Sequence, residues 1–142
     1  MSDRSWAIGR ALLEELQGEA GGEVERCGLL LARPESDRLE AHLAYPGPLY
    51  PRRFEMSPEW MLEAFVRQRS CGWEVAGFYH THPTGEALRP SPADLAGHPF
   101  GALVMLVGPV DWRAFRVGEG DWRELSLREL PASARVFSSE GQ

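Results

Sequence analysis

The chain has 142 residues, a length that suits one domain with a sizeable core. Its apolar fraction of 43% and charged fraction of 25% are ordinary for a globular protein. The formal charge is −6 and no Lys/Arg-rich run occurs, which argues against nucleic acid as the main partner.

The longest apolar runs, Cys27–Ala32 and Ala102–Val107, are far too short to span a bilayer. The opening stretch MSDRSWAIGRALLEEL lacks the apolar core of a signal peptide and reaches acidic residues too soon. We therefore expect a cytoplasmic protein with no membrane partner. The two cysteines, Cys27 and Cys71, fit that compartment, and a single disulfide is compatible with the sequence but not required.

Helices are expected in three places. Ser5 to Gln17 carries an apolar stripe at helical spacing and is followed by a glycine-rich segment that ends it. Ser57 as N-cap and Pro58 at the first helical position open a second helix that stops near Cys71. Ser91-Pro92 repeats this cap chemistry, so a short third helix is expected there.

Strands are expected between these helices, where apolar or alternating runs are bounded by glycine and proline. Their expected ranges are Cys27–Ala32, Leu39–Tyr45, Phe54–Met56, Glu74–Thr81, Ala102–Val107, and a hairpin of Trp112–Val117 and Trp122–Leu127. Mixed helices and strands, with neighbouring late strands, predict a single α/β sandwich on a mixed sheet. The domain should span residues 1–130, with residues 131–142 as a flexible tail.

The stretch GFYHTHPTGEALRPSPADL, Gly77–Leu95, carries most of the chemistry. His80 and His82 are two apart near the end of a predicted strand, so both imidazoles project from one face. Asp94 follows at the third helical position after the Ser91 cap, where the helix N-terminus keeps a carboxylate ionised. Two neutral imidazoles, a carboxylate and a water make a catalytic zinc site, and zinc lowers the pKa of that water. An ordinary polar loop is the alternative, which the strand-then-helix context disfavours.

Hydrolysis at such a site also needs a general base that can later act as an acid. Glu23 and Glu25 both lie at the mouth of the buried strand Cys27–Ala32, which sheet pairing could bring beside the end of the His80 strand. Cys27 is an alternative nucleophile. Because it opens an apolar strand and cysteine is often buried, core packing is the favoured interpretation. His42 is expected on a surface strand and His98 in a loop.

The sequence resembles a known family in three segments. Glu25-Arg26-Cys27-Gly28-Leu29-Leu30, then His80-Thr81-His82-Pro83, then Ser91-Pro92-Ala93-Asp94 resemble the JAMM motif of the MPN+ (Mov34/PAD-1) metalloproteases, of the stand-alone prokaryotic type. The resemblance runs from about Gly22 to Val110. It implies an α/β/α sandwich on a mixed, mostly antiparallel sheet, similar to the cytidine-deaminase fold.

The resemblance also implies roles for individual residues. His80, His82 and Asp94 would hold one Zn²⁺ per chain. Glu25, favoured over Glu23 by the Glu-x-Cys-Gly spacing, would be the general base and then the acid, and Ser91 would support the oxyanion. One departure is the loop Thr84–Pro90, whose seven residues exceed the usual six; we expect this loop to absorb the extra residue without moving the ligands.

By the same resemblance, the function would be that of a zinc isopeptidase or peptidase. It would use a zinc-bound water to hydrolyse an amide bond after the C-terminal tail of a ubiquitin-like or sulfur-carrier protein. The physical basis is that an extended tail can add to a sheet edge. The alternatives are a non-catalytic MPN-type interaction scaffold and a hydrolase of small amides. A homodimer through the Trp60 helix is left open.

Overall fold

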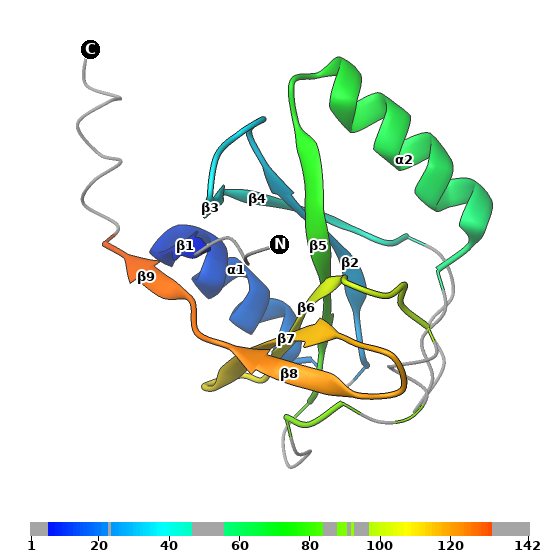
Figure 1. Ribbon diagram of the computed structural model, residues 1–142. Helices are drawn as coiled ribbons and strands as arrows, with labels where there is room; N and C mark the ends of the chain where they lie inside the picture. The colour runs from blue at the N-terminus through cyan, green and yellow to red at the C-terminus, as the bar shows by residue number, and fades with distance from the viewer. Residues whose placement is uncertain are drawn as a thin grey trace.

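The computed structural model describes residues 6–22, 24–46, 56–83, 88–90, 92 and 97–131 (Figure 1). The elements are β1 (Ala7–Gly9), α1 (Arg10–Ala20), β2 (Cys27–Ala32), β3 (Arg38–Leu39), β4 (Ala41–Ala44), α2 (Pro58–Ser70), β5 (Glu74–Thr81), β6 (Leu103–Val107), β7 (Trp112–Val117), β8 (Trp122–Leu125) and β9 (Arg128–Leu130). All but Pro92 of the helix expected from Ser91, most of the strand expected at Phe54–Met56 and nearly all of the expected tail lie outside the described residues.

The main sheet has six strands in the order β4-β2-β5-β6-β7-β8. Neighbouring strands run antiparallel except β5 and β6, which are parallel. The predicted mixed, mostly antiparallel sheet is therefore confirmed. Several predicted ranges are confirmed to the residue, among them β2, β5 and β7.

Helices α1 and α2 cover opposite faces of this sheet (Figure 1). The side chains of β2, which point alternately to the two faces, contact both helix layers. Leu30 packs in the cluster that contains the buried residues of α1, while Leu29 and Leu31 pack with Ala64 of α2. The predicted α/β/α sandwich is confirmed. None of the helices in the described part of the chain has the length and apolar character needed to cross a bilayer.

The first predicted helix is wrong at its start. Residues 7–9 form β1, which lies between β3 and β9 in a small parallel sheet, and α1 begins only at Arg10. The apolar residues that suggested a helical stripe include Ile8, which is fully buried by this pairing. Contacts from distant strands thus override the local periodicity. The helix also continues past Gln17 and ends at Ala20.

Helix α2 begins as its capping residues predict. The Ser57 hydroxyl accepts a hydrogen bond from the Trp60 amide at 3.3 Å, and Pro58 occupies the first helical position. Of its 13 residues only Ala64 is fully buried, and the side chains of Leu62 and Val66 are 69% and 60% exposed. The homodimer through this helix stays a prediction.

The strand expected at Leu39–Tyr45 is divided between the two sheets. Leu39 belongs to β3 in the small sheet, and β4 begins at Ala41 in the main sheet. Glu40, between them, donates its amide to Leu31 O at 3.0 Å. On the other side of the main sheet, the predicted hairpin of β7 and β8 is confirmed, although β8 ends at Leu125.

Candidate metal and catalytic site

The two histidines of the motif lie at the C-terminal end of β5. His80 is paired with Cys27 on β2 and Leu106 on β6, and the His82 amide donates to Val107 O at 2.8 Å. Their rings are stacked at 5.0 Å between centroids and 13° between planes. The two Nε2 atoms are 3.1 Å apart. The structure thus brings both imidazoles into one space, as their spacing of two residues predicts.

Burial sets the charge state of this pair. His80 is 1% exposed and His82 is 9% exposed. Burial lowers the pKa of His80 well below its usual value, and His82 and His98 lower it further. His80 is therefore a neutral imidazole at physiological pH, and the neutral ring is the form that binds metal ions.

These two side chains fit a zinc ion. Two nitrogen ligands of a tetrahedral zinc, each about 2.05 Å from the metal, lie roughly 3.3 Å apart. The Nε2 atoms of His80 and His82, at 3.1 Å, already have close to that separation. A zinc site needs at least one more protein ligand. Among the described residues no group of three His, Cys, Asp or Glu side chains could hold a metal, and the predicted third ligand, Asp94, is not one of those residues.

Glu25 lies at the same end of the sheet as the histidines. Strands β2 and β5 pair Cys27 with His80, and beyond this pair the Thr81 amide donates to Arg26 O at 2.8 Å. Glu25 lies two residues before Cys27 and His82 two residues after His80, so both residues lie just beyond the last regular pair of the two strands. Glu25 is half-buried there. The competing base, Glu23, lies outside the described residues.

Residues 11–118 match the family model described as prokaryotic homologs of the JAB domain. The match covers more than half of the chain. The chain belongs to this prokaryotic JAB family. No curated protein matches it.

Solved structures, two of them described as JAB1/MPN or JAMM proteins, agree with this assignment. The chain is 24% identical to a protein from Desulfitobacterium hafniense over 88% of this chain and 91% of that one, with a TM-score of 0.69. It is 23% identical to a JAB1/MPN domain protein from Archaeoglobus fulgidus, covering 90% and 100% of the two chains, with a TM-score of 0.61. A third structure is described as a JAMM metalloprotease-like zinc site in the proteasome and signalosome. The chain is 21% identical to it over 88% of this chain and 97% of that one, with a TM-score of 0.53. At these identities the likeness shows the fold, and the resemblance to the JAMM/MPN family is confirmed at that level.

Two further predicted site residues of this JAB domain, Ser91 and Asp94, lie outside the described residues. So does much of the loop Thr84–Pro90. The end of this loop has one described anchor, because Arg113 on β7 donates to Leu88 O at 3.1 Å while also binding Glu124. The roles of Ser91 and Asp94 stay predictions.

Cys27 is a core residue of the JAB domain. It is 1% exposed, and both it and Cys71 are free thiols. Burial raises the pKa of Cys27 to about 12, with smaller contributions from the charges of Glu25 and Glu19. A thiol that stays protonated is a poor nucleophile, so the structure supports the core-packing interpretation.

His98 lies closer to the predicted site than the motif indicates. It is in a loop, as expected, but only 7% exposed, and its ring packs against Phe78 with centroids 4.8 Å apart. Burial lowers its pKa to about 4. Because Phe78 is on β5, two residues before His80, this contact places His98 on the face of β5 that carries His80. Nothing in its sequence neighbourhood signals this position.

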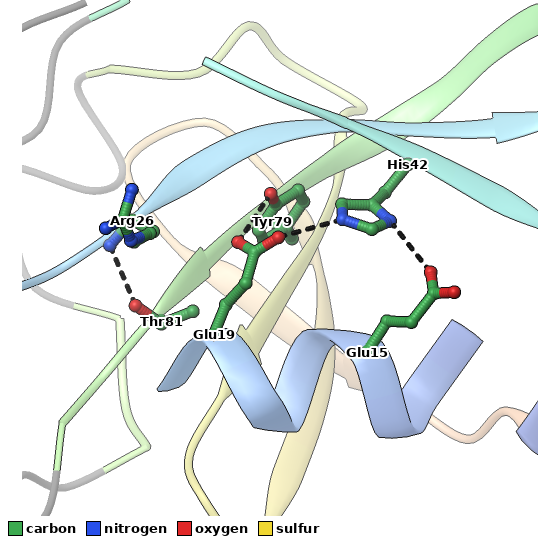
Figure 2. Close-up of polar contacts among 6 residues, drawn as sticks. All are labelled: Glu15, Glu19, Arg26, His42, Tyr79 and Thr81. Carbon is green, nitrogen blue, oxygen red and sulfur yellow. Dashed lines mark hydrogen bonds and ion pairs between the residues drawn. The ribbon is translucent and has the colours of Figure 1, made fainter. Parts of the chain in front are cut away.

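A polar network on the other face of the sheet joins α1 to β4 and β5 (Figure 2). The Tyr79 hydroxyl donates to Glu19 at 2.9 Å, and His42 contacts Glu19 at 2.8 Å and Glu15 at 3.5 Å. The surface position predicted for His42 is wrong, since its side chain is only 17% exposed. The partners of Glu19 are 23 and 60 residues away in the chain, so no local pattern reveals the network.

This network depends on close packing around Gly28 of β2. A Cβ at Gly28 would lie 2.8 Å from Cε2 of Tyr79 and would also meet the carbonyl oxygen of Leu43. Only glycine lets the three strands approach this closely. The Gly28 of the motif is thus explained by packing, without any role in the chemistry.

Replacing Tyr79 with phenylalanine should destabilise the protein by about 1–3 kcal/mol near neutral pH, because a carboxylate loses a hydrogen-bond donor. Burial alone would raise the pKa of Glu19, but its hydrogen bonds with His42 and Tyr79 outweigh burial and lower that pKa below 4.5. A depressed carboxyl pKa contributes stability above the unfolded-state pKa, and this is lost as pH falls through the folded-state pKa. The decrease in the free energy of unfolding caused by Tyr79→Phe should therefore become smaller below pH 4.5.

Urea unfolding of wild type and variant across this pH range measures the effect. Tyr45→Phe is the matched control, because the Tyr45 hydroxyl accepts a hydrogen bond from the uncharged Ser57 amide at 3.2 Å. The decrease in the free energy of unfolding caused by Tyr45→Phe should not change with pH over the same range. An equal pH profile for both variants would contradict the role assigned to Glu19.

Proposed function

We propose that this prokaryotic JAB protein is a zinc-dependent isopeptidase or peptidase. Its substrate is an amide bond after the C-terminal tail of a ubiquitin-like or sulfur-carrier protein. The observation that carries the proposal is the histidine pair, whose Nε2 atoms lie 3.1 Å apart at the end of β5. Glu25, two residues before the neighbouring strand β2 at the same sheet end, adds a carboxylate suited to general acid–base work.

Each residue has a distinct task in this proposal. His80 and His82, together with Asp94, would hold the zinc. When bound, zinc supplies a Lewis acid that activates water and polarises the amide carbonyl. Glu25 takes the proton released by the attacking water and returns it to the departing amine. Ser91 donates its hydroxyl to the developing negative charge on the carbonyl oxygen.

The proposed substrate class is supported by an edge strand of the main sheet that ends near the histidine pair. Among the described strands, β4 is an edge of the main sheet. The residue after it, Tyr45, donates its amide to Cys27 O at 2.8 Å, so this edge reaches the sheet end that carries His80. An extended tail can add to such an edge through main-chain hydrogen bonds.

The test is hydrolysis by zinc-loaded protein of a sulfur-carrier protein joined through its C-terminus to an amino acid or to a lysine side chain. Release of the carrier, abolished by a chelator and restored by zinc, is the expected result. Short free peptides and simple amides serve as comparison substrates. Equal cleavage of these would favour a small-amide hydrolase, and no cleavage of any substrate would favour the non-catalytic scaffold.

A further inference from the structure

The residue between the two histidines, Thr81, is fully buried and faces away from them. Successive strand residues point to opposite faces of the sheet. Thr81 lies on the α1 side of the sheet with Tyr79 (Figure 2). By strand alternation, the imidazole of His80 and that of His82, which is stacked on it, lie on the other side. The Thr81 side chain therefore contacts neither the predicted metal position nor a substrate bound there.

Thr81 binds both backbone groups of Arg26. Its amide donates to Arg26 O at 2.8 Å, and its hydroxyl oxygen accepts a hydrogen bond from the Arg26 amide, also at 2.8 Å. In a regular antiparallel pair, the second of these bonds would go to a backbone carbonyl. Here a side chain replaces that carbonyl just beyond Cys27 and His80, the last regular pair of β2 and β5. One of the two hydrogen bonds that attach Arg26, just before β2, to Thr81 therefore depends on a side-chain hydroxyl.

Glu25 directly precedes the residue that Thr81 holds. We propose that Thr81 is a positioning residue, whose hydroxyl fixes the backbone of Glu25 at the end of β5 that carries the histidines by binding the Arg26 amide. The catalytic consequence of this position rests on the proposed function, because it needs Glu25 to act as the base. The position itself does not rest on it. The competing interpretation is that the hydroxyl satisfies a buried amide and contributes only stability.

Three variants separate these interpretations. Thr81→Val keeps the shape of the side chain but removes the acceptor. Thr81→Ser keeps the acceptor. Ile8→Val, at a fully buried position of β1, removes one methylene outside the site and controls for a general loss of stability.

Hydrogen exchange of the Arg26 amide in metal-free protein is the first measurement. We expect exchange at least about tenfold faster in Thr81→Val, and close to wild type in Thr81→Ser and Ile8→Val, because only the valine frees this amide to open locally. Unchanged exchange in Thr81→Val would overturn the proposal.

The second measurement is hydrolysis of the carrier conjugate by zinc-loaded protein. Thr81→Val should lower kcat about 10- to 100-fold, since small displacements of a catalytic group have effects of this size. KM and zinc content should stay as in wild type, and Thr81→Ser should restore kcat. A wild-type kcat in Thr81→Val, with the Arg26 amide exchanging fast, would show that the bond gives stability alone.

The failure of the proposed function would have a different signature. If wild type cleaves no conjugate, that function is wrong, and kcat no longer reports on Thr81. The Arg26 exchange rates and a crystal structure of Thr81→Val then decide the positioning. A Glu25 backbone that stays in its wild-type place would overturn it, and a displaced one would support it.

Discussion

Protein purified without chelators or an immobilised-metal column should contain about one zinc ion per chain, and His82→Ala should lose it. The reason is geometric: His80 and His82 offer two nitrogens 3.1 Å apart, and removing one leaves too few protein ligands. Since losing even an outer-shell partner weakens metal binding about 10- to 100-fold, losing a direct ligand should cost more than 100-fold. Elemental analysis after dialysis measures the content directly.

The matched control for this experiment is His42→Ala. His42 is also a histidine on a strand of the main sheet, but it binds Glu19 on the opposite face, so its loss should leave the zinc in place. Circular dichroism checks that both variants fold. Wild-type protein without zinc, even after zinc is added and the sample dialysed, would refute the metalloprotease proposal and favour the scaffold.

Glu25→Gln should abolish most hydrolysis while leaving zinc bound. Glutamine has nearly the same shape as glutamate but cannot accept and return the proton, and general acid–base catalysis contributes about 10²- to 10⁴-fold to rate. The assay is release of the carrier from its conjugate, with zinc content measured on the same samples. A parallel loss of zinc would mean that Glu25 acts on the metal site itself.

Glu74→Gln provides the control, because Glu74 is an exposed glutamate at the far end of β5 and should be neutral in this assay. Glu23 is the alternative base. If Glu25→Gln keeps wild-type activity and Glu23→Gln loses it, the assignment from the Glu-x-Cys-Gly spacing is wrong. If both variants keep full activity, neither carboxylate is the base.

Much of the fold could be predicted from local features of the sequence. Strand β2 is a continuous apolar run that ends before Pro34, and α2 has both a serine cap and a first-turn proline, so the predicted starts of both match the structure. Strand β1 has three residues and exists only because β3 and β9 pair with it from elsewhere in the chain. No window of sequence around Ile8 contains that information.

Some features of the candidate site could likewise be predicted from local sequence, and others could not. The shared face of His80 and His82 follows from strand alternation and was predictable. The place of Glu25 depends on the register of β2 against β5, about 50 residues away, which the motif resemblance supplied and periodicity could not. The burial of His98 and the network of His42, Glu19 and Tyr79 are contacts between distant segments of polar residues, for which hydrophobic periodicity carries no signal.

The single parallel pair in the main sheet, β5 and β6, affects how the site can change. Parallel neighbours need a long connection, because the chain must return along the sheet before the next strand starts. Residues 82–102 make this connection, and the register of β5 against β6 places no condition on their number. Residues can therefore be gained or lost between Pro83 and Ser91 without shifting a strand. In the proposed hydrolase, substrate choice would therefore vary through this connection while His80 stays fixed in the sheet.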